Sequence, residues 1–388
     1  MRHGFFSQLA PELLIMRPAF SSTTSAAAFA LALLFLMLLP VLIKKAWLPP
    51  REQSYAIQGW DNGPYPWLRQ QIFEETNDID IAFVGSSLMM WGIDTPYVQE
   101  KLSAELGRPA VVRSLCWGGT GYDALYLIGQ DLLKHRKVRL LVFYDEDNKI
   151  NERNPLSCIW FRYGDNAEAL AGLAVKEKGL LYFAAIIGMP RNLLNLLRPN
   201  LPLELYSTKP NYMEVQYQTP NPATRLGSVS AEMGCTPSGE GATFTWFQPR
   251  TAASPADVCL YSPTNPAGFQ FLNKPLPEWQ IHFAKKFADL AGTSGCELVM
   301  LKIPLLDTAR SSVIRERAVW PDVLQHQVKM VGIPPARLFA GLSEEELYRL
   351  YANAGHINAS HMNRNGQEYF TRLITPALLK IYETSTDH

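Results

Sequence analysis

A short apolar segment that ends in a glycine and two serines constrains the fold of this chain more than any other feature. Residues Ile79 to Val84 are β-branched, aromatic or small except for one Asp, a composition typical of a strand buried in a parallel sheet. Gly85, Ser86 and Ser87 follow directly. Active sites of open α/β sheets lie at the carboxyl ends of strands, so a functional turn is predicted at Ser87. A plain strand-to-helix turn with a serine cap would use the same residues.

Further apolar segments repeat this pattern of a strand followed by a helix. Predicted strands cover residues 110–115, 138–144 and 297–303. One predicted helix has Thr95 as its N-cap and Pro96 as its first residue, and ends at Gly107. Further helices are predicted over about 124–133, 278–291, 307–330 (with a break at Pro321 as an alternative), 343–353 (with a Ser343/Glu346 capping box) and 367–382. Alternation of strands and helices at this spacing predicts an α/β fold with a parallel, doubly wound sheet.

An apolar run of the length of a membrane span lies near the N-terminus. Residues 25–43 read SAAAFALALLFLMLLPVLI, and a spanning helix needs roughly 20 such residues. A buried core helix would show a polar face, and a cleaved signal peptide would be followed by small residues rather than by Lys44 and Lys45. The run therefore predicts an uncleaved, single transmembrane helix, whose orientation the flanking charges leave open.

These patterns divide the chain into successive regions. We expect an N-terminal tail at 1–24, the transmembrane anchor at 25–43, a Pro- and Trp-containing linker at 44–77, and a domain at 78–388. An insertion at about 154–271 interrupts the strand–helix rhythm of that domain. Cys235 and Cys259 flank a loop-rich stretch of it and would form a disulfide in an oxidising compartment, whereas free buried thiols are the alternative.

Charge and cysteine spacing exclude several classes of function. The chain of 388 residues has 36 basic and 36 acidic residues, and this zero net charge disfavours a nucleic-acid partner. The five cysteines include no CxxC pair, so no structural zinc site is expected. We expect neither a metal nor another cofactor.

Four groups of residues at predicted strand and loop ends fit nucleophilic catalysis. A serine nucleophile needs a nearby base and hydrogen-bond donors for the oxyanion. Ser87 follows the first strand, Gly118 or Gly119 the second and Asn148 the third, while His361 precedes the last helix. The carboxyl ends of parallel strands share one edge of a sheet, so these groups are expected to meet there.

At these residues the chain resembles the SGNH hydrolases, also called the GDSL family. Residues 85–88, GSSL, resemble the GDSL block, with Ser86 in place of its Asp and Ser87 in the nucleophile position. Residues 358–366, NxxHMNxxG, resemble the closing block DxxHLNxxG, which puts His361 in the position of the base. The resemblance implies a three-layer, flavodoxin-like α/β/α sandwich with oxyanion donors from Ser87, the Gly118/Gly119 loop and Asn148.

The resemblance also implies a function and a location. The order of anchor, linker and SGNH-like domain is similar to that of bacterial envelope proteins that modify polysaccharides, such as alginate O-acetylation and lipoteichoic-acid D-alanylation proteins. It implies an esterase or O-acyltransferase in the inner (plasma) membrane, with a periplasmic catalytic domain acting on an envelope or exported polysaccharide. A membrane-bound protein that supplies the acyl group would be a further partner.

Departures from the family pattern leave two other classes open. Asn358 replaces the Asp that orients the base, so a scaffold that keeps the fold without efficient catalysis is one alternative. Asp145 and Asp147 follow the third strand as a DxD motif, which a Mg²⁺-dependent phosphatase would use. His356 is an alternative base, although its spacing does not match the closing block.

Overall fold

The computed structural model describes residues 21–46, 51–55, 64–117, 121–144, 157, 167–187, 249, 253–261, 268–307, 309–317, 320, 328–351 and 361–385. Two compact units, Met1–Leu48 and Pro49–His388, are each considered by themselves. The first contains α1 (Thr23–Ala46), which includes the apolar run. Within the described part of the chain no helix is both long and apolar enough to cross a membrane, so the predicted spanning helix is not found there.

The second unit alternates strands and helices, as the sequence predicts. Its elements are η1 (Arg51–Tyr55), α2 (Pro64–Arg69), η2 (Gln70–Glu74), β1 (Ile79–Gly85), α3 (Ser87–Gly92), α4 (Thr95–Leu106), β2 (Val112–Cys116), α5 (Tyr122–His135), β3 (Val138–Phe143), α7 (Ala167–Leu170), α8 (Val175–Ile187), η3 (Pro255–Asp257), β4 (Cys259–Tyr261), β5 (Phe269–Leu272), α12 (Glu278–Thr293), β6 (Glu297–Leu301), β7 (Ile314–Arg317), β8 (Val328–Gly332), α14 (Pro335–Leu338), α15 (Glu344–Tyr348) and α16 (Arg364–Thr384).

The main sheet is mostly parallel and has the strand order β2-β1-β3-β6-β8-β4. Its first five strands are parallel to one another, and β4 pairs antiparallel with β8 at one edge. If the five parallel strands are renumbered along the chain, their order is 2-1-3-4-5. The α/β class predicted from the sequence is therefore confirmed. Strands β5 and β7 form a separate two-stranded parallel sheet.

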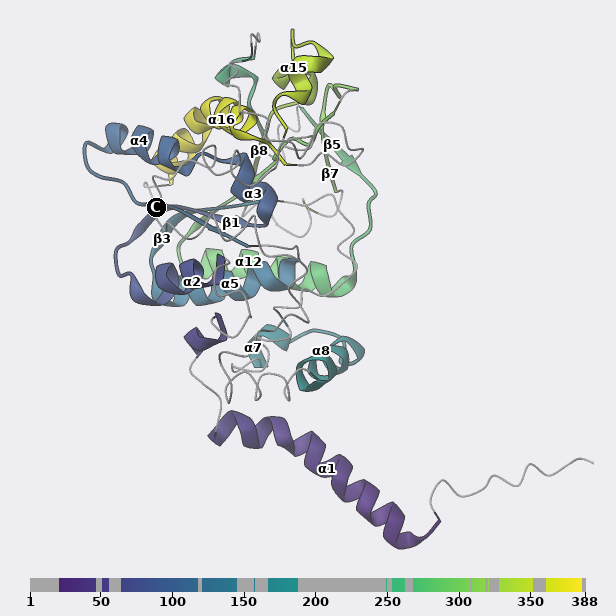
Figure 1. The fold of residues 1–388 in the computed structure, drawn as a ribbon. Coiled ribbons are helices and arrows are strands. Elements are labelled where there is room, and N and C mark those ends of the chain that lie inside the picture. Colours follow the sequence, from purple (N-terminus) through teal and green to yellow (C-terminus); the bar gives the residue numbers. More distant parts are fainter. Residues whose placement is uncertain are drawn as a thin grey trace, which may run out of the picture. The chain divides into compact units, whose positions relative to one another are not determined.

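Helices cover both faces of this sheet (Figure 1). Helices α3, α4 and α16 lie on one face, and α2, α5 and α12 lie on the other. Side chains of β1 alternate between them: Ile81 and Phe83 pack into the core beneath α16, whereas Ala82 and Val84 pack into the core beside α5 and α12. This alternation follows from the two-residue period of a strand, and both cores exclude water from β1.

Local signals at two helix ends act largely as the sequence predicts. Gly107 ends α4 in the left-handed conformation with φ 62°, which costs glycine little. The predicted N-cap of this helix is shifted by one residue, because the side chain of Asp94, not Thr95, accepts the hydrogen bond from Tyr97 N. The Ser343/Glu346 capping box is present at the start of α15.

One prediction about the later part of the chain is wrong. A single helix over 307–330 is not formed, because the described residues of that range contain β7 and the start of β8; Trp320 is the one described residue of the range that is helical. The Asp307 carboxylate accepts hydrogen bonds from the backbone N–H groups of residues 309, 310 and 311, which favours a turn, and β8 is buried beside β6. The thiol of Cys259 is free, and Cys235, its partner in the predicted disulfide, lies outside the described residues.

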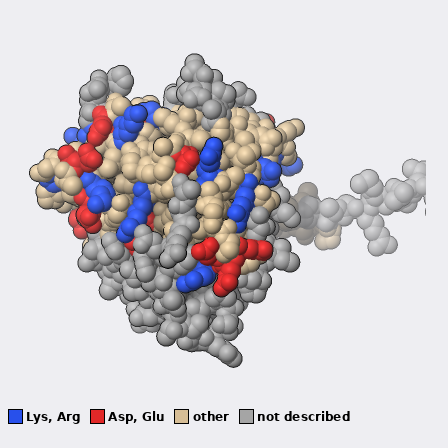
Figure 2. Space-filling view, turned by 90° about the horizontal axis from the view of Figure 1, so that it is seen from above, with Lys and Arg blue, Asp and Glu red and all other residues tan. Residues whose placement is uncertain are grey.

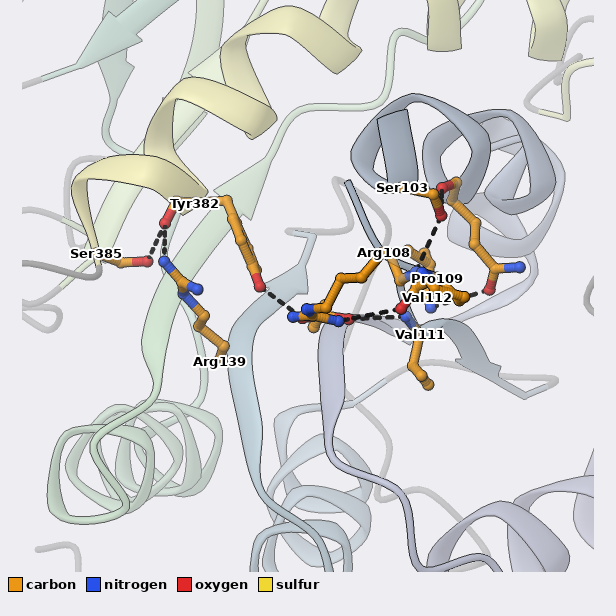
Figure 3. A network of polar contacts seen from close by, with 11 residues as sticks. Ser103, Arg108, Pro109, Val111, Val112, Arg139, Tyr382 and Ser385 are labelled. Carbon is orange, nitrogen blue, oxygen red and sulfur yellow. Dashed lines mark hydrogen bonds and ion pairs between the residues drawn. The ribbon is translucent and has the colours of Figure 1, made fainter. Parts of the chain in front are cut away.

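A buried carboxylate ties α16 to the amino-terminal edge of the sheet (Figure 3). Asp80, near the start of β1, accepts hydrogen bonds from the Arg108 guanidinium at 2.6 Å, from the Tyr382 hydroxyl and from the Val111 N–H. Figure 3 labels these three partners, Arg108, Val111 and Tyr382. Burial alone would raise the pKa of Asp80, but these hydrogen bonds outweigh it and hold the pKa below its ordinary value of 3.8. The network therefore stabilises the charged form and fixes the last turns of α16.

We predict that Asp80→Ala lowers the free energy of unfolding by about 3 kcal/mol, because it leaves three donors without their acceptor. The contribution of Asp80 is present above its unfolded pKa and is lost as the pH falls through the lower folded pKa. Urea unfolding at neutral pH measures the change. Glu100→Ala, which removes an exposed partner of Lys101, is the control and should have almost no effect. Equal stability of Asp80→Ala and wild type would contradict this role.

Candidate functional site

Ser87 lies where the chain leaves β1, at the point where the strand order of the sheet reverses. From β1 the chain goes to β2 on one side and then to β3 on the other, and open α/β sheets bind ligands at the carboxyl ends of such strands. Ser86 caps α3, since its Oγ accepts a hydrogen bond from Leu88 N at 3.3 Å. Ser86 is buried by this role, whereas Ser87 begins the helix and is only half-buried.

The side chain of Ser87 meets His361 across 274 positions of the sequence. Ser87 Oγ and His361 Nε2 are 2.8 Å apart, which is a hydrogen bond. With the ring proton on Nδ1, Nε2 accepts the hydroxyl hydrogen. Burial lowers the pKa of His361, so the imidazole stays neutral and able to accept a proton at a lower pH than a free histidine. A serine with a neutral imidazole on its hydroxyl has the arrangement of a nucleophile and its general base.

The residues after His361 explain why it is held at this place. Met362 forms a β-bridge with Tyr351, and Asn363 N donates to Leu350 O at 3.0 Å. The Asn363 side chain caps α16 by accepting from the N–H groups of residues 365 and 366, and its amide donates to Arg349 O at 2.8 Å. His361 therefore precedes a short segment that is fixed at both its backbone and its side chains.

Gly366 is required by the close approach of the two chain segments. A Cβ atom at Gly366 would lie 2.2 Å from the carbonyl oxygen of Leu350, a distance that real Cβ atoms do not show. The Asn and Gly of the closing block thus have structural roles here, since one caps the helix and the other admits the neighbouring backbone. Both roles bring the His361 segment against residues 349–351.

A pair of buried polar side chains joins the helix of Ser87 to the helix that follows His361. Gln367 Nε2 donates to the carbonyl oxygens of Met90 and Ile93 at 3.4 and 3.1 Å. One turn later on α16, Thr371 Oγ1 accepts from Asp94 N at 2.9 Å. The last carbonyl groups of a helix have no partners within it, so these bonds satisfy the end of α3 and fix its position against α16.

The structure describes only part of the predicted site. It brings Ser87 and His361 together and gives Ser86 a capping role. The remaining predicted residues lie outside the described residues: Gly118, Gly119, Asp145, Asp147, Asn148, His356 and Asn358. Among the residues that are described, no cluster of three or more His, Cys, Asp or Glu could hold a metal ion.

Sequence reasoning missed the polar residues that position the pair. Gln367 and Thr371 are buried and four residues apart, so they share one face of α16 with apolar core residues. Polar residues at core positions of a predicted helix were the available signal for them. Trp91 was also missed, and its ring packs edge-on against the His361 ring.

Comparison with known proteins adds no relative. No protein family model, no curated protein and no solved structure matches the chain. Its function is therefore inferred from its own residues and their geometry.

We predict that Gly366→Ala lowers the free energy of unfolding by about 1–3 kcal/mol, because its methyl group would overlap the Leu350 carbonyl. Gly179→Ala is a matched control in α8, where an added Cβ meets nothing within 4 Å and should raise helix stability by up to about 1 kcal/mol. Urea unfolding midpoints compare the two variants. A Gly366→Ala protein as stable as wild type would show that this close approach is not a constraint.

Proposed function

We propose that this protein is a serine esterase or O-acyltransferase with Ser87 as nucleophile and His361 as general base. The observation that carries the proposal is the 2.8 Å contact between Ser87 Oγ and His361 Nε2 at the switch point of the sheet. Two residues so distant in sequence meet there because α16 is tied to α3 and the residues after it near its start and to β1 near its end. The half-buried hydroxyl and the lowered pKa of His361 suit general-base catalysis near neutral pH.

The reaction follows from the chemistry of this pair. His361 Nε2 takes the hydroxyl proton as Ser87 Oγ attacks the carbonyl carbon of an ester, which gives a tetrahedral intermediate. The intermediate collapses, the bond to the alcohol oxygen breaks, and His361 gives its proton to that oxygen. The acyl group on Ser87 then passes to water in hydrolysis, or to an acceptor hydroxyl in transfer.

We further propose that the fold is the flavodoxin-like sandwich of the SGNH hydrolases. The strand order 2-1-3-4-5 of the parallel strands and the two helical layers support this. The structural roles of Asn363 and Gly366 support the likeness of the closing block. Oxyanion donors from Gly118, Gly119 and Asn148, and orientation of the His361 ring by Asn358, remain parts of the proposal.

The substrate class belongs to the proposal as well. An acylated envelope or exported polysaccharide offers the ester or hydroxyl group that this chemistry needs. Described acidic and basic side chains are interspersed over the face seen from above in Figure 2. Such a mixture produces no strong field of one sign, which suits an uncharged or weakly charged group at the reacting centre and recognition through close contacts.

Attachment to the inner membrane, with the catalytic domain on its outer side, is the proposed location. Exposed apolar side chains along α1 support contact with lipid, since eight residues between Phe29 and Leu38 are 47–67% exposed. Alkaline-phosphatase and fluorescent-protein fusions after Pro50 test the orientation. Active phosphatase is expected, and fluorescence with inactive phosphatase would exclude a role in the envelope.

We predict that Ser87→Ala and His361→Ala each lower kcat/KM for a short-chain ester by about a thousandfold or more, since each removes one half of a unit. The double variant should be little slower than either single one. Ser86→Ala loses the helix-capping hydrogen bond from Leu88 N, and His135→Gln loses the hydrogen bond to Asp131 O and the ring contact with Phe73. Both variants keep Ser87 and His361, so they are controls and should keep activity. Activity of Ser87→Ala equal to that of Ser86→Ala would reject the proposed function.

Position 358 offers a separate test of the third catalytic group. If Asn358 orients the His361 ring, Asn358→Asp should keep or raise the rate, because a carboxylate also stabilises the imidazolium that forms. Steady-state kinetics of this variant beside Asn358→Ala measures the effect. A large loss of kcat with Asn358→Asp would show that a carboxylate does not fit this role.

A further inference from the structure

Trp91 lies one helical turn after Ser87 on α3. Residues four apart share a face of a helix, so the Ser87 hydroxyl and the Trp91 indole are on the same side of α3. His361 contacts both of them. Its Nε2 is hydrogen-bonded to Ser87 Oγ, and its ring meets the indole edge-on, with ring centroids 6.0 Å apart and planes at 76°.

Burial of the Trp91 indole is unfavourable for its N–H group. Trp91 is only 3% exposed, and its Nε1 has no hydrogen-bond partner among the described residues. A buried donor without a partner costs about 1–3 kcal/mol. What Trp91 supplies is therefore the apolar bulk and the shape of its ring, in contact with His361.

We propose that Trp91 is a positioning residue for His361, and that its indole forms the wall that keeps the imidazole turned toward Ser87 and shielded from water. This inference rests on the proposed function of the Ser87–His361 pair. The inference extends the proposed function, because it gives a role to Trp91, which in the proposed reaction takes up no proton and forms no bond with the acyl group.

The physical basis is the freedom of a histidine side chain. The hydrogen bond to Ser87 fixes one edge of the imidazole, and rotation about the side-chain bonds would break it. An edge-on aromatic contact adds about 0.5–1.5 kcal/mol and occupies the space into which the ring would turn. Burial also lowers the pKa of His361, as expected for an imidazole beside an apolar wall.

Three variants of the full-length protein test the inference. Trp91→Leu removes the aromatic wall, whereas Trp91→Phe keeps a smaller aromatic ring and removes the N–H, which has no hydrogen-bond partner among the described residues. Trp279→Leu is the matched control, because Trp279 is equally buried, at 5% exposed, but belongs to α12 and the core on the other face of the sheet. Thermal unfolding verifies that each variant is folded at the assay temperature.

Kinetics with a short-chain ester should separate the variants. We expect Trp91→Leu to lower kcat about tenfold or more with little change in KM, because the base is misaligned while substrate binding is intact. Trp91→Phe should retain kcat within about threefold, and Trp279→Leu should match the wild type. Wild-type kcat in Trp91→Leu, or an equal loss in Trp91→Phe, would overturn the inference.

A nuclear magnetic resonance measurement makes the inference independent of catalysis. The ring current of the indole shifts the His361 ring protons, which His361→Gln assigns by their disappearance. Trp91→Leu should move these resonances toward those of an exposed histidine, and Trp91→Phe should keep most of the shift. Unchanged resonances in Trp91→Leu would overturn the Trp91 inference, whereas an active Ser87→Ala would reject the proposed function itself.

Discussion

The docking of α16 against α3 is the interaction on which the candidate site depends. Gln367 and Thr371 satisfy backbone groups at the end of α3 from within a buried interface. Neither side chain could be lost without leaving those groups unpaired in an apolar surrounding, which costs more than the net gain of the bonds. This difference between the cost of unpaired groups and the gain of paired ones favours one placement of α16 on α3, because other placements of the two helices would bury the same groups without partners.

The same helix is held at its far end by Asp80, and the two attachments together set the position of His361. Tyr382 reaches Asp80 at the amino-terminal edge of the sheet, while Gln367 and Thr371 lie toward the carboxyl edge. Asn363 caps the start of α16 and ties it to residues 349–351. His361, two residues before that cap, is therefore held next to Ser87 by a helix that is fixed near both of its ends.

Sequence reasoning could predict the parts of the molecule that depend on local patterns. The strand before Ser87, the glycine that ends α4 and the capping box of α15 follow from short-range chemistry that each segment carries within itself. The pairing of Ser87 with His361 was predictable because parallel strands bring their carboxyl ends to one edge. The prediction of a helix over 307–330 was wrong, because β8 forms a strand through its pairing with β6, and the local sequence pattern contains no information about that neighbour. Gln367, Thr371 and Trp91 escaped notice for the same reason, since their partners are distant in sequence.

The central claim is that the Ser87 hydroxyl is activated by His361, and covalent labelling tests it most directly. The full-length protein is treated with a fluorophosphonate probe, and its peptides are mapped by mass spectrometry beside those of His361→Ala. The account predicts a single major adduct on Ser87 in the wild type and a large fall in its rate of formation in the variant. Absence of an adduct on Ser87, or labelling at the same rate without His361, would contradict it.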